Sequence, residues 1–260
     1  NLILASPSRD DENADDVVLY TSLPSSLETG DDLVLLTRKS TGKLDLAGRP
    51  RPTVPSSTAE ALAGPYSPEW RSGMVEEFNG FKTQDAYGLV KRRPGMNVLG
   101  SRWHHSIRSD DEGDPTQLKS RLVIQGCKTI PFLADYGATF APLPNLGIVM
   151  SFFALSAHKG WEIWCTDFFK GYLAARIAAG EEPIYAKQPP GFEEPGKEDW
   201  VMQLNRAAYG LPQSGRQLHL LVKEFCEDVD YLPISEEVSF YLGEKDGKEA
   251  AFLIYVDDGL

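Results

Sequence analysis

The stretch KEAAFLIYVDDGL, residues 248–260, decides the fold. Its apolar run ends in two adjacent carboxylates, Asp257 and Asp258, and an Asp-Gly pair precedes it. A short apolar run bounded by turn residues is typical of a buried strand, and Asp-Gly favours a hairpin with the strand before it, residues 238–242. We therefore expect an antiparallel hairpin that brings two carboxylates to the end of a sheet.

A third carboxylate, Asp167, ends another apolar segment 90 residues before Asp257. A sheet can bring two such strand ends together. Carboxylate oxygens are the ligands that Mg²⁺ prefers, and two Mg²⁺ ions about 4 Å apart support displacement at phosphorus. By itself an Asp-Asp pair at a turn is more often a solvated turn, so the pair needs support from the rest of the chain.

Three helices are expected around this sheet. The first begins at Ser67-Pro68-Glu69, which combines a capping hydroxyl, a proline in the first turn and an acid near the positive end of the helix dipole. The second opens at Pro144-Asn145 and ends at Gly160, and the third covers residues 214–229. Each shows apolar residues at helical spacing: Trp70, Met74, Phe78 and Phe81; Leu146, Val149, Met150 and Phe153; Leu218, Leu221, Val222, Phe225 and Val229.

Residues 88–90, 99–107 and 118–125 are expected to form strands. The acidic, glycine-containing segment 109–115 joins the last two into a projecting hairpin. This order of helices and strands indicates an α+β fold, an antiparallel sheet with packed helices.

The N-terminal part has a different composition. The first 69 residues carry 11 acidic and 6 basic side chains and include a stretch rich in Pro, Ser and Thr. Such a segment buries too little apolar surface to fold alone. We predict a linker or disordered tail over residues 1–66 and the folded domain over residues 67–260.

Charge, cysteines and hydropathy set further bounds. The net charge of −12 opposes nucleic-acid binding, because Lys and Arg contacts to phosphate supply much of that affinity.

Cys127, Cys165 and Cys226 form no C-x-x-C pair, which predicts buried free thiols instead of a zinc site or disulfides. Apolar runs are far shorter than the roughly 20 residues that cross a bilayer, and no signal peptide is recognised. We expect a soluble intracellular protein, cytoplasmic or nuclear, without a membrane partner.

Residues 70–260 resemble the reverse transcriptase domain of Ty1/copia-type retrotransposons. The resemblance rests on five ordered blocks: KSRLV at 119–123, TFAP at 139–142, QPPGF at 188–192, YGLPQ at 209–213 and YVDD at 255–258. It implies the fingers and an incomplete palm of a right-hand polymerase fold, with RNA-directed DNA polymerase as the activity.

The resemblance also implies site residues. Asp167, Asp257 and Asp258 are the implied catalytic ligands of two Mg²⁺ ions, with Mn²⁺ as a substitute. Lys119 and Arg121 alternate on one strand and are implied to face the incoming triphosphate, where Arg gives bidentate contacts and Lys a point charge. The alternative for these two cations is a solvated strand surface.

Two more residues follow from the same resemblance. Tyr172, five residues after Asp167, is implied to close on the 2′ carbon of the sugar, where its ring excludes a ribose 2′-OH. Gln213 is implied to contact the nucleotide and the template. Read from the residues alone, Tyr172 is better explained as a packing aromatic. Gln213 could equally cap the helix that follows.

The sequence ends two residues after YVDD, so by comparison with that family we expect the thumb and the RNase H domain to be missing. We therefore expect little DNA synthesis from this chain alone. The missing strand beyond Leu260 is expected to leave an unpaired edge. Implied partners are an RNA or DNA template-primer, deoxynucleoside triphosphates and other products of a retroelement polyprotein. One alternative is a catalytically retired interaction protein of the same fold. A nucleotidyl cyclase ranks lower, because it leaves Lys119, Arg121 and Gln213 unexplained.

Overall fold

The computed structural model describes residues 16–21, 33–38, 44, 46, 48–126, 139–168, 170–177, 182–235, 239–245, 247–256 and 258–260. At residues 16–21, 33–38, 166, 167 and 245 it describes the backbone alone. The chain forms two compact units. Unit 1 comprises residues Asn1–Lys39, Thr139–Ala175 and Gly215–Leu260, and unit 2 comprises Ser40–Ala138 and Arg176–Ser214.

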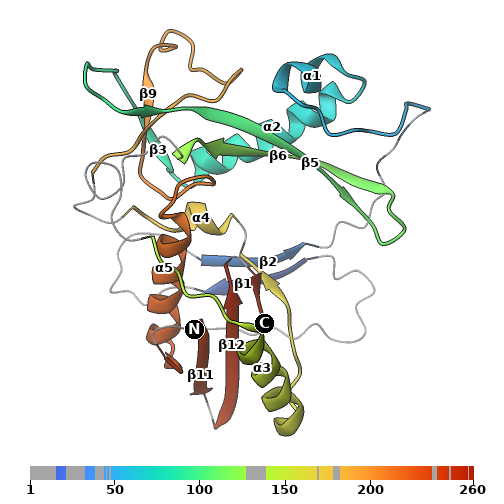
Figure 1. Ribbon diagram of the computed structural model, residues 1–260, viewed down its shortest axis with the longest axis vertical. Helices are drawn as coiled ribbons and strands as arrows, with labels where there is room; N and C mark the ends of the chain where they lie inside the picture. Colours follow the sequence, from blue (N-terminus) through green and yellow to red (C-terminus); the bar gives the residue numbers. More distant parts are fainter. Residues whose placement is uncertain are drawn as a thin grey trace. The chain divides into compact units, whose positions relative to one another are not determined.

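Unit 1 is built on a five-stranded antiparallel sheet of order β10-β11-β12-β13-β7. Figure 1 shows β11 beside β12 in this sheet. A separate pair, β1 and β2, is also antiparallel. The strands are β1 (Asp16–Thr21), β2 (Leu33–Arg38), β7 (Thr166–Asp167), β10 (Tyr231–Pro233), β11 (Phe240–Lys245), β12 (Lys248–Tyr255) and β13 (Asp258–Gly259). The helices are α3 (Leu146–Lys159), α4 (Gly171–Ala174) and α5 (Ser214–Asp228), whose first residue belongs to unit 2.

Helix α3 packs on this sheet with a face that differs from the expected one. Phe152 is buried against Phe240 of β11 and Leu253 of β12, whereas Leu146 and Met150 are 76% and 59% exposed. The helix is apolar on several sides, so helical spacing alone does not determine which side is buried. Its ends are as expected, because the Asn145 side chain accepts a hydrogen bond from the Ile148 N–H and Gly160 ends the helix with a left-handed φ of 66°.

The last residues of the chain continue the sheet. Leu260 exchanges backbone hydrogen bonds of 2.8 and 2.9 Å with Leu253, and β13 pairs with β12 on one side and with β7 on the other. The expected unpaired edge is therefore wrong for the end of β12, because residues 258–260 already occupy it.

Unit 2 contains a four-stranded sheet of order β3-β9-β8-β4 and a two-stranded ribbon, β5–β6. All neighbouring strands are antiparallel except β4 and β8, which are parallel. The strands are β3 (Tyr87–Val90), β4 (Val98–Leu99), β5 (Ser101–Ser109), β6 (Pro115–Ile124), β8 (Tyr185–Lys187) and β9 (Val201–Leu204), and the helices are α1 (Thr58–Ala63) and α2 (Ser67–Thr83).

The ribbon is covered on one face by α2 (Figure 1). The expected apolar face of α2 is buried, and alternate residues of β6 are buried beneath it. Gly73 permits the close approach, because a Cβ at this position lies 3.1 Å from the Leu118 carbonyl oxygen. The cap differs from the prediction, since Tyr66 is the N-cap and makes no side-chain cap bond, while Pro68 lies in the first turn. The antiparallel α+β class is confirmed.

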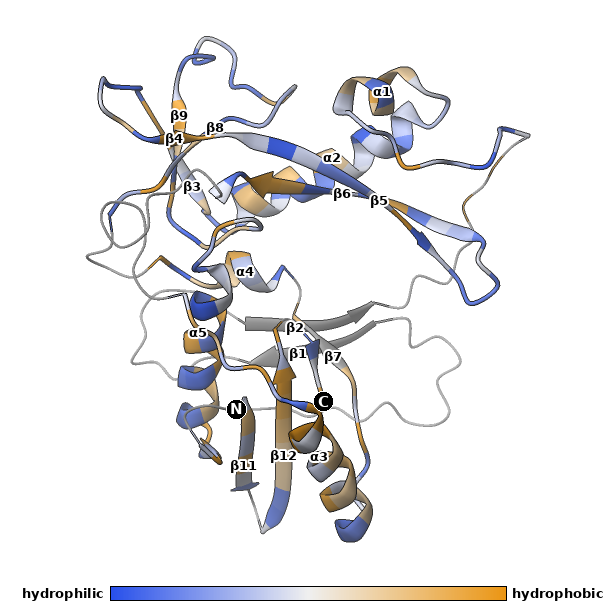
Figure 2. Cartoon of the chain, in the orientation of Figure 1, coloured by the Kyte–Doolittle hydropathy of each residue, from blue (hydrophilic) through white to orange (hydrophobic). Residues whose placement is uncertain are grey.

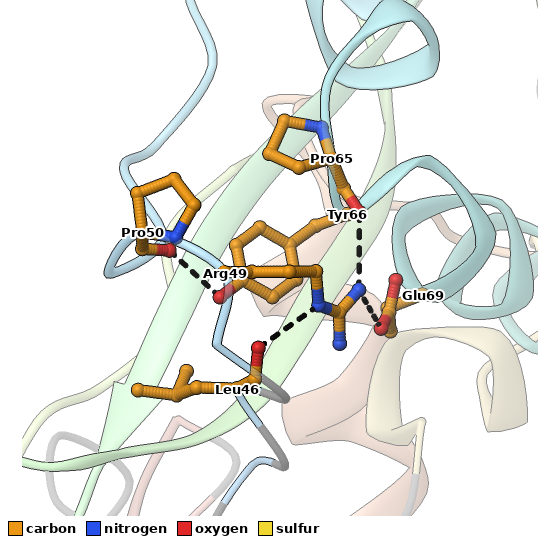
Figure 3. Close-up of polar contacts among 6 residues, drawn as sticks. All are labelled: Leu46, Arg49, Pro50, Pro65, Tyr66 and Glu69. Carbon is orange, nitrogen blue, oxygen red and sulfur yellow. Dashed lines mark hydrogen bonds and ion pairs between the residues drawn. The ribbon is translucent and has the colours of Figure 1, made fainter.

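Part of the range predicted as a tail contacts the start of α2 (Figure 3). The Arg49 guanidinium pairs with Glu69 at 2.6 Å, donates to the Pro65 carbonyl at 3.0 Å and lies 4.2 Å from the ring centroid of Tyr66. The Tyr66 hydroxyl donates to the Pro50 carbonyl at 2.8 Å. These contacts, together with helix α1 and strands β1 and β2, are structure within residues 1–66 that composition does not predict.

The expected buried thiol is confirmed at Cys226 and is wrong at Cys165. Cys226 is buried, and burial raises the pKa of its thiol to about 12, whereas Cys165 is exposed and Cys127 lies outside the described residues. Within the part of the chain that the structure describes, no helix is both long enough and apolar enough to traverse a membrane.

His105 should make stability depend on pH. Its ring is buried beside Trp70, 5.1 Å between centroids, and its Nδ1 lies 3.0 Å from the Ser120 hydroxyl. Desolvation, and then the charge of His104, lower the pKa of His105 below its ordinary 6.5. Because the folded-state pKa is depressed, the neutral ring's contribution is complete above the unfolded-state pKa and declines as pH falls below it.

We therefore expect the free energy of unfolding, measured with urea, to fall between pH 7.5 and pH 5.5. The fall should be smaller in His105→Phe, whose ring does not titrate. His104→Gln, at the exposed neighbouring position, is the matched control and should keep most of the fall. Equal falls in wild type and His105→Phe would contradict the assignment.

Candidate active site

The expected carboxylates lie on one continuous ladder of unit 1. In the register of β12, β13 and β7, Asp258 is opposite Tyr255 on one side and opposite Asp167 on the other. Directly opposed residues of antiparallel strands lie about 4.5–5.5 Å apart at Cα and share a face of the sheet. The backbone thus brings Asp167 and Asp258 together across 91 positions of sequence. Asp257 lies outside the described residues.

The turn that precedes Asp258 is tight and strained. Residues 256 and 257 are the only positions between the paired Tyr255 and Asp258. Val256 has a φ of 61°, in the left-handed region that a β-branched side chain rarely occupies. Such a conformation costs roughly 1–3 kcal/mol and persists where surrounding structure holds it in place. The ladder on both sides of β13 supplies that constraint.

Tyr172 belongs to the same unit as these aspartates. It lies in the one-turn helix α4, where its neighbours Gly171 and Leu173 are buried and Tyr172 itself is half-buried. Lys170 begins the turn with a left-handed φ of 51°. The structure thus holds Tyr172 on a short ordered turn that follows β7.

Lys119 and Arg121 belong to unit 2, on strand β6. Both are half-buried and alternate with Leu118, Ser120 and Leu122, which are buried under α2. The two cations therefore share the face of the ribbon that α2 does not cover. The Arg121 guanidinium lies 5.5 Å from the ring centroid of Tyr209, a favourable cation–π distance.

The YGLPQ loop, residues 209–213, is attached to the end of β6. The Ile124 N–H donates to the Tyr209 carbonyl at 2.8 Å, and the Gly126 N–H donates to the Gly210 carbonyl at 3.2 Å. Gly210 has a φ of 92°, and a Cβ there lies 2.1 Å from the Ile124 carbonyl oxygen. Only glycine satisfies both the dihedral angle and this approach. Sequence reasoning assigned Gly210 to the turn but did not detect its attachment to β6 or the role of Tyr209 beside Arg121.

Gln213 is the most unusual residue of this loop. Its side chain is 1% exposed, and among the described residues neither Oε1 nor Nε2 has a hydrogen-bond partner. It is therefore not a helix cap, and the hydroxyl of Ser214 closes the loop instead, through the Ala208 carbonyl at 2.6 Å and the Ala208 N–H at 3.1 Å. Leaving a buried polar group unpaired costs about 1–3 kcal/mol, so each native example calls for an explanation.

The expected site residues form two groups. Asp167, Asp258 and Tyr172 lie in unit 1, and Lys119, Arg121 and Gln213 lie in unit 2. The first group offers carboxylates for a cation. The second offers positive charge and an amide for an anionic, hydrogen-bonding ligand.

Comparison with known proteins identifies the family. The family model described as reverse transcriptase (RNA-dependent DNA polymerase) matches residues 84–260, and the chain belongs to this family. The match confirms the resemblance drawn from the five blocks and leaves the nucleotidyl cyclase alternative without support.

The curated relatives are Pol polyproteins of plant transposons, which agrees with the expected copia type. The chain is 28% identical to the retrovirus-related Pol polyprotein from transposon TNT 1-94 of Nicotiana tabacum, over 79% of this chain and 15% of that protein. Identity is 26% to the polyprotein from transposon RE2 and 25% to that from RE1, both of Arabidopsis thaliana. The chain covers 14% of the RE2 polyprotein and 16% of the RE1 polyprotein, so it spans a small part of these relatives. No solved structure matches the chain.

The unpaired amide of Gln213 should lower the stability of the folded protein. Gln213→Met removes a desolvated amide at similar volume, so the free energy of unfolding should rise by about 1 kcal/mol. Gln217→Met is the matched control, because Gln217 is also buried but has an interaction partner, and this variant should lose stability. Urea denaturation of both variants measures the difference. Loss of stability in Gln213→Met would show that the amide is paired in the folded protein.

Proposed function

We propose that this chain carries the fingers and palm of a copia-type reverse transcriptase and catalyses RNA-directed DNA synthesis through two metal ions. The observation that carries the proposal is the register of Asp258 opposite Asp167 within a chain of the reverse transcriptase family. Unit 1 would correspond to the palm, since it holds the aspartate ladder, and unit 2 to the fingers, since it holds the cationic ribbon.

The ladder suits a pair of divalent cations by the chemistry of its donors. Asp167, Asp257 and Asp258 offer hard carboxylate oxygens, which Mg²⁺ and Mn²⁺ prefer. Two such ions, when bound, lower the pKa of an attacking hydroxyl and neutralise charge that develops on the transferred phosphate. The constraint on β13 keeps Asp258 in place for this role, because its strand is paired on both sides.

The remaining residues would bind and select the nucleotide. Lys119 and Arg121 would neutralise the triphosphate, and the ring of Tyr209 fixes the orientation of the Arg121 guanidinium. Tyr172 would lie against the deoxyribose and exclude a 2′-OH. Gln213 would donate and accept hydrogen bonds to the nucleotide and template, which would satisfy its orphaned amide.

The isolated chain should synthesise DNA slowly. Its net charge of −12 opposes the phosphate contacts on which template affinity depends, so the template-primer should dissociate readily. The same acidity favours the second candidate, a catalytically retired protein that binds other proteins. Binding of divalent metal ions distinguishes an active polymerase from the catalytically retired protein, because a site that has lost catalysis has no need to keep its cations.

The test combines metal binding with single-turnover primer extension on RNA and DNA templates. We expect Mn²⁺ binding, seen by electron paramagnetic resonance, and slow extension in Mg²⁺ at excess protein. Asp258→Asn should weaken Mn²⁺ binding at least tenfold and lower extension at least a hundredfold. Asp228→Asn, at an exposed position on α5, should leave both unchanged. A wild-type chain that binds no Mn²⁺ would refute the polymerase proposal. Rapid, processive DNA synthesis would contradict the expectation that the isolated chain extends primers slowly.

A further inference from the structure

The QPPGF loop, residues 188–192, contributes no side chain to the proposed site, yet the structure holds it tightly. It opens the connection from β8 to β9 and is closed by Gln188, whose side chain is 8% exposed. The Gln188 amide donates to the carbonyls of Lys197 and Trp200 at 2.6 and 3.1 Å, and its oxygen accepts from the Glu194 N–H at 2.8 Å. A buried amide with three hydrogen bonds gives the loop one fixed conformation.

This closed loop is bonded to the start of β5. The Trp103 indole N–H donates to the Pro190 carbonyl at 3.0 Å, and the Ser101 hydroxyl donates to the Gln188 carbonyl, also at 3.0 Å. Trp103 is 6% exposed, so its N–H is largely shielded from water. The loop therefore fixes the first residues of the ribbon through one carbonyl at each of two positions.

Aromatic rings extend the attachment from β5 to α2. The ring centroid of Phe192 lies 5.3 Å from that of Trp103 and 5.5 Å from that of Phe78 on α2. Phe78 also stacks on Tyr87 of β3, with centroids 5.7 Å apart and an interplanar angle of 18°. These distances are typical of favourable aromatic pairs. The QPPGF loop thus joins β5 to α2 and, through Phe78, to β3.

The YGLPQ loop holds the other side of the same rung of the ribbon. Ser101 of β5 is opposite Ile124 of β6, and the Ile124 N–H donates to the Tyr209 carbonyl at 2.8 Å. This end of β6 is strongly hydrophobic, whereas the hairpin tip is hydrophilic (Figure 2). Two loops that are distant from the ribbon in sequence therefore clamp it at its hydrophobic base.

Arg121 projects from the ribbon close to this clamped base. It lies three residues before Ile124 and next to Leu122, which is fully buried and opposite Trp103. Side chains of a strand move with its backbone, so the position of the Arg121 guanidinium depends on where the clamp holds the ribbon. Gln213, the other expected ligand of the nucleotide in unit 2, belongs to one of the two clamping loops.

We infer that Trp103 and Gln188 are positioning residues, which hold Arg121 at the distance from Gln213 that one nucleotide requires. The inference rests on the proposed polymerase function and deepens it. Trp103 fixes the ribbon to the QPPGF loop, and Gln188 keeps that loop closed. Trp103 and Arg121 lie on opposite faces of the ribbon, because Trp103 is opposite Leu122 and Arg121 is opposite His104. Trp103 therefore acts through the backbone and not by contact with the nucleotide.

Single-turnover primer extension with increasing dTTP tests the inference on the full chain. Trp103→Phe keeps an aromatic ring and removes the N–H that bonds Pro190. The apparent Kd for dTTP should rise about fivefold, the worth of one neutral hydrogen bond, with the maximal rate within twofold of wild type, because only nucleotide binding is disturbed. Trp200→Phe is the matched control, since its ring contacts Lys197 in the same connection, and should leave both values within twofold.

A double-mutant cycle determines whether Trp103 acts through Arg121. Arg121→Gln should itself raise the Kd for dTTP at least tenfold. In that background Trp103→Phe should add less than twofold, because the group that it positions is gone. Gln188→Met, which removes the bonds that close the loop, should follow the same pattern. Equal factors for Trp103→Phe with and without the Arg121 side chain would overturn the inference, because a general loss of stability acts equally in both backgrounds.

Hydrogen exchange separates the inference from the proposed function. In Trp103→Phe the amides at the base of the ribbon, residues 101–103 and 122–124, should exchange faster than in wild type, whereas those of β12 in unit 1 should keep their rates. Faster exchange at this base in a chain that binds no Mn²⁺ would keep the clamp and refute the polymerase. Unchanged exchange in Trp103→Phe, at a wild-type melting temperature, would overturn the inference whatever reaction the chain catalyses.

Discussion

The pairing of β13 with both β12 and β7 is the constraint on which the rest of the site depends. One short strand joins two parts of the chain that are 91 positions apart, and it sets Asp258 opposite Asp167. It also fixes both ends of the strained turn at Val256, which could relax if either pairing were lost. Strand pairing therefore supplies both the proximity of the carboxylates and the rigidity of the turn that presents them.

Unit 2 has a comparable constraint of its own. The YGLPQ loop is hydrogen-bonded to the end of β6, and Gly210 allows the two backbones to approach closely. This attachment places Tyr209 beside Arg121. Helix α5 begins at Ser214, directly after the buried Gln213. The cations of the ribbon and the amide of the loop are thus parts of one rigid arrangement, built mainly from backbone contacts.

Sequence patterns predicted the parts of the fold that local periodicity determines. Trp70, Met74, Phe78 and Phe81 repeat at helical spacing and are buried. Lys119 and Arg121 alternate on the strand as expected, between the buried Leu118, Ser120 and Leu122. Periodicity failed for α3, which is apolar on several sides. Composition gave no sign of the Arg49 contacts, which depend on the Pro65 carbonyl and the Glu69 carboxylate, 16 and 20 residues further along the chain. The isolated amide of Gln213 and the register of the ribbon are tertiary features. Both depend on contacts between residues that are distant in sequence, which local periodicity does not predict.

The most direct test of the aspartate ladder is a disulfide cross-link at its central rung. In a chain whose three native cysteines are changed to serine, Asp167→Cys with Asp258→Cys should form a disulfide under mild oxidation, because opposed Cα atoms lie within the roughly 4.4–6.8 Å that a disulfide spans. Asp167→Cys with Tyr255→Cys should not, since these positions are two strands apart, about 9.6 Å. Failure of the first pair in folded protein, or equal cross-linking of both pairs, would contradict the account.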